Sequence, residues 1–276
     1  GEEEFVFYDG VLYRSQLRGQ VAGTNVLEGK CYFMDHQYRM FPLAKDTTAY
    51  QMTVGYRSNF ETKNYQFNQT RVNSYFFETY TNQVVADTTN YSTFENSVYA
   101  KFDNSLFGKL KLDLHHIQWD YSFAENDYQK DTISPNGINA SQLAFEAKWS
   151  KSIFGAQLDA GLYNSLKEAY GTKAWNVSIS RPLFKDIALQ LSYKDRSQPL
   201  NFNFYLFQSD YKEYNWSTLD IQNQEFRTQS VVLSHPKWGR VSGEWTTLDN
   251  YTFFNNTTPL RNLNEKFKVE VLQLDK

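Results

Sequence analysis

The stretch IALQLSYK, residues 187–194, alternates strictly between two kinds of side chain. Its odd-numbered positions carry Ile, Leu, Leu and Tyr, and its even-numbered positions carry Ala, Gln, Ser and Lys. Successive side chains of a β-strand point to opposite faces, so a period of two predicts a strand with one apolar and one polar face.

The same alternation recurs along the chain, for example in GKLKLDL (108–114) and FGAQLDAGLY (154–163). Between such segments lie residues 61–95 and 196–224, which we interpret as long loops rich in Asn, Tyr and Thr. We predict about twelve strands, with boundaries uncertain by about two to four residues, near residues 11–21, 30–41, 49–60, 96–103, 109–121, 141–149, 156–164, 173–181, 187–195, 225–233, 240–248 and 265–274.

The composition narrows the class of protein. The mean hydropathy is −0.64, and no apolar run approaches the roughly 20 residues that a transmembrane helix needs. Aromatic residues nevertheless make up 17% of the chain, among many Asn, Ser, Thr and Gln. A transmembrane β-barrel combines such features, because one side of each strand faces lipid and the other faces a polar interior. We therefore predict an all-β protein, a transmembrane antiparallel up-and-down β-barrel; the alternative is a soluble antiparallel sheet with one solvated face.

The lengths of the connections favour the barrel. The connections after Phe102 and Trp149 are short, those after Ser122 and Lys194 are long, and the one after Tyr163 is intermediate. Outer-membrane barrels have tight periplasmic turns and longer extracellular loops, whereas a sandwich has no reason to sort its loops in this way.

The short turns share an aromatic residue: Phe107, Phe154, Phe184 and Trp238. An aromatic ring in a tight turn suits a membrane–water boundary, so we expect these four residues to mark the periplasmic end. A ring packed beneath a soluble sheet is the alternative.

Two further patterns concern the end of the predicted barrel opposite the short turns. Residues 200–216, LNFNFYLFQSDYKEYNW, interleave rings with amides and charges, which suits a segment that folds back over the rim of a pore. In the strand at 109–121 the apolar side changes near His115 and His116. Either a β-bulge or the passage of the strand out of the lipid would produce this change.

Catalytic signatures are not evident. The four histidines are scattered, and His115 and His116 point to opposite faces of a strand, so we predict no metal site, no cofactor and no enzymatic activity. The single Cys31 excludes an intrachain disulfide. With 28 basic and 31 acidic residues the chain has no basic excess, so we expect no nucleic-acid partner.

If the apolar face meets lipid, the polar face lines a lumen. Basic residues outnumber acidic ones among the candidates, which suggests a mild preference for anions. The same charges could equally solvate the wall or pair across neighbouring strands. The lumen-facing candidates are Arg14, Gln16, Arg18, Arg39, Arg57, Lys101, Lys109, Lys111, Glu146, Lys148, Gln157, Asp159, Asn176, Ser178, Gln190, Ser192, Lys194 and Glu244.

Four segments resemble the outer-membrane β-barrel porins of Bacteroidetes. They are LEGKCYFMDHQYRM (27–40), NFETKNYQFNQ (59–69), LNFNFYLFQSDYKEYNW (200–216) and LDNYTFF (248–254), in an order and spacing that cover nearly the whole chain. The resemblance implies a barrel in the bacterial outer membrane. Members of that family are longer, and this chain lacks the C-terminal aromatic residue common on bacterial barrels. We therefore expect residues 1–276 to form a single β-barrel domain that is a portion of a longer chain.

The expected function is passive diffusion of small hydrophilic solutes through the barrel, with outer-membrane lipid around it. A plugged barrel within a larger outer-membrane complex is an alternative, and its long loops would then contact protein partners. A soluble glycan-binding β protein is a third possibility, because exposed rings can stack on sugars. A hydrolase in the lumen is disfavoured, since no nucleophile–base pair is visible in the sequence.

Overall fold

The computed structural model describes residues 5–8, 11–14, 23–40, 51–69, 78–80, 85–124, 135–166, 170–184, 186–218, 222–237, 239–255, 258–261 and 267–275. Nearly all elements in these ranges are strands, and α2 (Phe202–Tyr205) is a single short turn of helix. No helix in the described ranges is long and apolar enough to cross a membrane. The strands are β1 (Phe5–Tyr8), β2 (Val11–Arg14), β3 (Gly23–Arg39), β4 (Gln51–Gln69), β5 (Val85–Asn104), β6 (Gly108–Phe123), β7 (Gly137–Ile153), β8 (Ala156–Ser165), β9 (Lys173–Phe184), β10 (Ile187–Gln198), β11 (Leu206–Phe207), β12 (Trp216–Ser217), β13 (Gln224–His235), β14 (Gly239–Asp249), β15 (Thr252–Asn255), β16 (Thr258–Arg261) and β17 (Phe267–Asp275).

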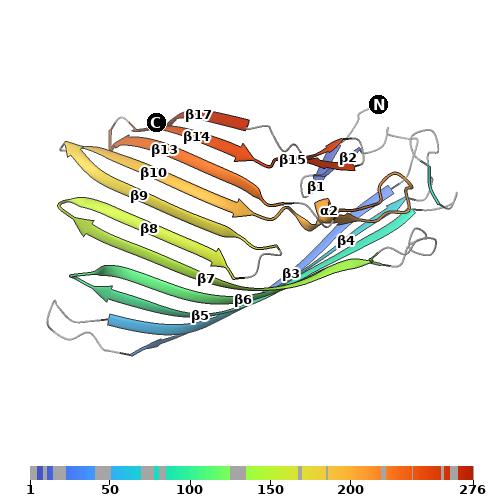
Figure 1. Cartoon of the computed structure of the whole chain (residues 1–276), viewed down its shortest axis with the longest axis horizontal. Helices are drawn as coiled ribbons and strands as arrows, with labels where there is room; N and C mark the ends of the chain where they lie inside the picture. The colour runs from blue at the N-terminus through green and yellow to red at the C-terminus, as the bar shows by residue number, and fades with distance from the viewer. Residues whose placement is uncertain are drawn as a thin grey trace.

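Eleven strands form one large curved sheet in which each pairs with the long strands nearest to it in the chain (Figure 1). The order is β17-β14-β13-β10-β9-β8-β7-β6-β5-β4-β3, and every pairing is antiparallel. This up-and-down arrangement confirms the predicted fold class. Within the described part of the chain, β3 and β17 are the two edges of the sheet.

Eleven of the twelve predicted strands correspond to strands of this sheet. The strand predicted at 11–21 is wrong as a barrel strand, because Val11–Arg14 pairs with β1 in a separate hairpin. The long loop predicted at 61–95 is also wrong at both ends, since β4 continues to Gln69 and β5 begins at Val85. The outer face of these extensions is polar, with Thr62 and Asn64 on β4 and Asn90 on β5, so they lack the apolar outer face by which the other strands were predicted.

The two faces of the sheet differ in polarity and in crowding. On β5, Tyr99 is 1% exposed, whereas the neighbouring Val98, on the other face, is 59% exposed. A curved sheet crowds side chains on its concave face and spreads them on its convex face. We call the face that carries Tyr99 the inner face and the face that carries Val98 the outer face.

The outer face carries an apolar band. On β5 the band runs from Phe94 to Phe102, and we take Phe94–Phe102 as the membrane-spanning segment of this strand. On neighbouring strands Leu114, Leu162 and Val177 extend the same band and are exposed. An exposed apolar belt of this extent has the character of a lipid-facing surface.

Within the large sheet, the four short connections β5–β6, β7–β8, β9–β10 and β13–β14 lie at one end, on the left in Figure 1, and the segment with α2 lies at the other end. In the β5–β6 turn, Asn104 Oδ1 accepts hydrogen bonds from the backbone N–H groups of Leu106 and Phe107, at 2.7 and 3.1 Å. Gly108 closes this turn with φ of +85°, a conformation that glycine adopts without strain. The turn therefore follows from two residues, an Asn that binds the backbone and a Gly at the left-handed position.

The predicted aromatic turn residues lie at this end. Phe107, Phe154 and Phe184 are all strongly exposed, and Phe154 is 94% exposed. Phe154 and Gly155 both have positive φ, of 49° and 76°, which is the pattern of a two-residue hairpin turn. Trp238 lies outside the described residues.

The connection between β10 and β13 folds back against the inner face near the long-loop end. Tyr121 and Phe123 on β6 pack in one buried cluster with Tyr205, Leu206 and other residues of this connection. The pairings of β6 with β5 and β7 continue without a register shift, so the change of apolar side near His115 is not a bulge. The apolar residues that follow it, such as Tyr121 and Phe123, lie on the inner face, where the returning segment covers them.

Candidate functional site

Five basic residues of the inner face lie in one row across the sheet. Directly opposed pairs link Lys101 on β5 to Lys111 on β6, and Lys111 to Lys148 on β7. Through Thr53 and Lys101 the row reaches Arg39 on β3, and through Gly161 and Asn176 it reaches Lys194 on β10. We call Arg39, Lys101, Lys111, Lys148 and Lys194 the basic row.

Like charges directly opposed on neighbouring strands destabilise a sheet, by about 0.2–1 kcal/mol for a pair. The basic row contains two such contacts, and carboxylates one step along the strands partly offset them. Lys111 Nζ lies 2.8 Å from Asp113, and Lys148 Nζ lies 2.7 Å from Glu146. In the described part of the chain, Arg39, Lys101 and Lys194 have no carboxylate within ion-pair distance, so the row keeps a surplus of positive charge.

The buried Tyr99 connects the basic row to the neighbouring strands. Its ring lies beneath three cations, with Lys101 Nζ at 4.9 Å, Lys111 Nζ at 5.4 Å and Arg57 Cζ at 5.4 Å from its centroid. Its hydroxyl donates a hydrogen bond of 2.7 Å to Asp35 Oδ1. The face of an aromatic ring attracts cations, so Tyr99 helps to hold the like charges together.

Tyr99 can lie flat on β4 because its cross-strand partner is Gly55. A Cβ atom at Gly55 would come within 2.3 Å of the Tyr99 ring. At Gly29, by contrast, the nearest atom to an added Cβ is the carbonyl oxygen of Thr62 at 3.6 Å, an ordinary contact. Gly55 is therefore required by packing, not by backbone conformation.

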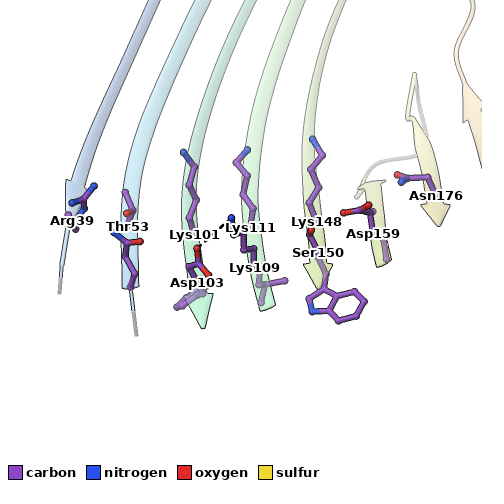
Figure 2. Close-up of a pocket in the computed structure, with 16 residues that line it drawn as sticks. Arg39, Thr53, Lys101, Asp103, Lys109, Lys111, Lys148, Ser150, Asp159 and Asn176 are labelled. Carbon is purple, nitrogen blue, oxygen red and sulfur yellow. Dashed lines mark ion pairs between the residues drawn. The ribbon is translucent and has the colours of Figure 1, made fainter. Parts of the chain in front are cut away.

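Figure 2 shows part of the basic row, with Lys101, Lys111 and Lys148 side by side on adjacent strands and extended in the same direction. They line a hollow of about 470 Å³ in the wall. Asp103 and Asp159 lie on the side of the hollow nearer the short turns, where Lys109 Nζ is 3.9 Å from Asp103. The positive charges of the basic row thus lie between two sets of carboxylates, Asp103 and Asp159 on one side and Asp113 and Glu146 on the other.

Strand register places most of the predicted lumen residues on the inner face. Arg14 lies on β2 in the separate hairpin, and Gln16 and Arg18 lie outside the described residues. Whether the inner face encloses a water-filled lumen stays a prediction. The predicted residues on the inner face are Arg39, Arg57, Lys101, Lys109, Lys111, Glu146, Lys148, Gln157, Asp159, Asn176, Ser178, Gln190, Ser192, Lys194 and Glu244.

Sequence reasoning missed four inner-face residues that organise this wall: Glu95, Tyr99, Asp113 and His115. Asp113 and His115 continue the polar alternation of Lys109 and Lys111, so the same period of two could have found them. Glu95 was missed because it falls in the segment interpreted as a loop. Tyr99 was missed because an aromatic residue was expected on the lipid side.

A second polar site joins β5 to the returning segment, beyond the membrane-spanning part of β5. Asp87 accepts hydrogen bonds from the hydroxyl of Ser209 and from the backbone N–H of Asp210, the latter at 2.8 Å. Burial raises the pKa of the Asp87 carboxyl to about 7, and the nearby charge of Asp210 adds to the rise. Gln208 also donates to the carbonyl oxygen of Pro135 at 2.6 Å, so the segment is attached at several points.

The sheet is antiparallel and up-and-down, with an exposed apolar belt on one face and charged residues on the other. This is the architecture of a transmembrane β-barrel protein. The family described as "Putative porin" matches residues 12–276. The chain therefore belongs to this family. No curated protein matches the chain.

Proposed function

We propose that this protein is an outer-membrane β-barrel that conducts small hydrophilic solutes by passive diffusion, with a preference for anions. Membership of the porin family supports a channel and not an enzyme. The apolar outer belt supports a location in a bilayer and argues against a soluble glycan-binding protein. Nucleic acid is not among the proposed partners.

The basic row carries the proposed preference for anions. Three of its five cations have no carboxylate partner in the described part of the chain, and their side chains share one level of the wall. A solute that passes along this wall meets their charges together. Rings or arcs of one sign of charge concentrate counter-ions locally and set the ion preference of a pore.

A second candidate function follows from the returning segment, which the structure describes at residues 199–218. Its apolar residues pack against the inner face, and its polar residues bind β5, so it covers part of the wall at the long-loop end. A barrel closed in this way would serve as a component of a larger outer-membrane complex, and other long loops would contact its partners.

Two measurements separate these functions. Liposomes that contain the purified full-length protein should swell when small sugars are added if the lumen is open, and should not swell if it is sealed. For open channels, the reversal potential in a tenfold KCl gradient reports the ratio of chloride to potassium permeability. Chloride preference supports the proposal, and potassium preference would refute the role given to the basic row.

A third measurement tests the location. The protein should require detergent or lipid to remain dispersed, and it should be recovered with the outer-membrane fraction of the cells that produce it. A purified chain that stays monomeric in buffer without detergent would exclude the membrane proposal.

A further inference from the structure

Three potential metal ligands meet on the inner face of β6 and β7. Asp113 and His115 are two residues apart on β6, so their side chains share a face, and Glu146 is directly opposite Asp113 on β7. One ring nitrogen of His115 and one carboxylate oxygen from each acid lie within 4.8 Å of one another. Asp113 and His115 are 1% and 7% exposed, so the cluster is part of the wall and not a solvated surface patch.

The polar atoms of this cluster are incompletely satisfied. His115 Nδ1 lies 2.8 Å from Glu95 Oε1, while His115 Nε2 is buried and has no hydrogen-bond partner. Asp113 does not share this deficit, because the Lys111 ammonium lies 2.8 Å from both of its carboxylate oxygens. Buried polar atoms in native proteins nearly always have a partner, so the unpartnered Nε2 of His115 beside two carboxylates indicates a missing one among the described residues.

The contact between His115 and Glu95 is typical of a metal-binding histidine. Such a histidine usually donates its other ring N–H to a carboxylate, which fixes the tautomer and leaves the second nitrogen as an electron-pair donor. Here Glu95 engages Nδ1, which leaves Nε2 for an ion. His115 Nε2 is buried without a hydrogen-bond partner among the described residues, and a bound cation would supply one.

We propose that Asp113, His115 and Glu146 bind one divalent transition-metal ion, for which zinc fits the donor set. One imidazole and two carboxylates are ligands that Zn²⁺ commonly takes, and Ca²⁺ and Mg²⁺ prefer oxygen ligands alone. Ligands about 2.1 Å from a tetrahedral ion lie about 3.4 Å apart, so the three groups must draw together by roughly 1 Å. Glu146 is the least buried of the three, so rotation of its side chain can supply most of this movement.

The ion would compete with two lysines of the basic row. Lys111 and Lys148 now neutralise Asp113 and Glu146 at 2.8 and 2.7 Å. A divalent ion on the same carboxylates would displace these ammonium groups or share the oxygens with them. Removal of one ammonium should therefore strengthen metal binding, whereas a purely structural cluster has no reason to respond in this way.

The test uses the full-length protein without an affinity tag, folded in detergent and freed of metal with EDTA. Equilibrium dialysis against Zn²⁺, read by elemental analysis, gives stoichiometry and affinity. We expect one ion per chain in the wild type and loss of that ion in His115→Ala and in Glu146→Gln. His116→Ala is the matched control, because His116 lies on the outer face of the same strand, and it should bind as the wild type does.

Two further variants distinguish ligation from folding. Glu95→Gln should weaken Zn²⁺ binding by about 10–100-fold, the usual effect of a residue that orients a metal ligand. Lys148→Gln should bind Zn²⁺ severalfold more tightly. Cobalt in place of zinc should show visible absorption bands that disappear with His115→Ala. Absence of a bound ion in the wild type, or equal binding by His115→Ala and His116→Ala in folded protein, would overturn the proposal.

Discussion

Reversal of the charge at Lys101 should shift the ion preference of the channel more than it shifts folding. Lys101 lies within the basic row and has no carboxylate partner among the described residues, so its charge is not neutralised locally. Its replacement by Gln removes one positive charge from the wall, and replacement by Glu exchanges the sign. Both changes also relieve the like-charge contact with Lys111, at the cost of the contact with the Tyr99 ring.

The size of the effect follows from Coulomb's law. An anion that passes roughly 7 Å from the ammonium gains about 0.6 kcal/mol in water, and 0.1 M salt reduces this to about 0.3 kcal/mol. A cation loses the same amount. Lys101→Gln should therefore lower the ratio of chloride to potassium permeability about threefold, and Lys101→Glu should lower it about eightfold.

Planar-bilayer recordings in a KCl gradient measure this ratio directly. Lys30→Gln is the control, since Lys30 is opposed to Thr62 on the outer face and its loss leaves the inner wall unchanged. The effect of Lys101→Glu should shrink in 1 M salt, where the screening length is about 3 Å. If Lys101→Glu conducts normally and its reversal potential equals that of the wild type, the basic row does not set the ion preference.

Three other predictions concern the wall and the returning segment. Gly55→Ala should displace the Tyr99 ring and lower the free energy of unfolding in urea by about 1–3 kcal/mol, whereas Gly29→Ala should change it little; equal losses would remove the packing explanation. The pKa of Asp87 is raised, so the attachment of the returning segment to β5 should be most stable below about pH 4 and should weaken as the pH rises through about 7. Single-channel conductance should therefore be larger at pH 8 than at pH 5. Asp87→Asn should abolish that difference. Addition of micromolar Zn²⁺ to open channels should increase chloride preference if the ion frees two lysines of the basic row, and a fall in chloride preference would contradict that coupling.

The period of two in the sequence predicted which strands exist and which face each side chain takes, wherever one face meets lipid. It failed at 61–69 and 85–95, where the strands continue beyond the apolar band. There the outer face carries Thr62, Asn64 and Gln66, so the apolar outer face is lost although strand pairing continues. Backbone hydrogen bonds, which the pattern of side chains does not report, maintain these extensions.

The register of strand pairing could not be predicted from the sequence, for a different reason. A shift of two residues between β5 and β6 keeps every side chain on its face, so hydrophobicity does not distinguish it from the observed pairing. The β5–β6 turn resolves the ambiguity, because Asn104 and Gly108 fix where the hairpin closes and thereby bring Lys101 opposite Lys111. The basic row is in this sense a consequence of the short turns.

The same register explains why a charged wall of this kind remains folded. Between β6 and β7, the inner-face pair Lys111–Lys148 is followed by the inner-face pair Asp113–Glu146, so a repulsive pair of cations lies beside a repulsive pair of anions. Ion pairs along the strands relieve both repulsions at once, but they leave Lys101 without a carboxylate and His115 Nε2 without a partner. Lys101 can therefore attract an anion, and the cluster of Asp113, His115 and Glu146 can bind a cation nearby. Binding of either ion changes the electrostatic potential at the other position. A double-mutant cycle of Lys101→Gln with Glu146→Gln, measured on chloride preference in the presence and absence of Zn²⁺, should show coupling only when the metal is present; additive effects in both conditions would mean that the two sites act independently.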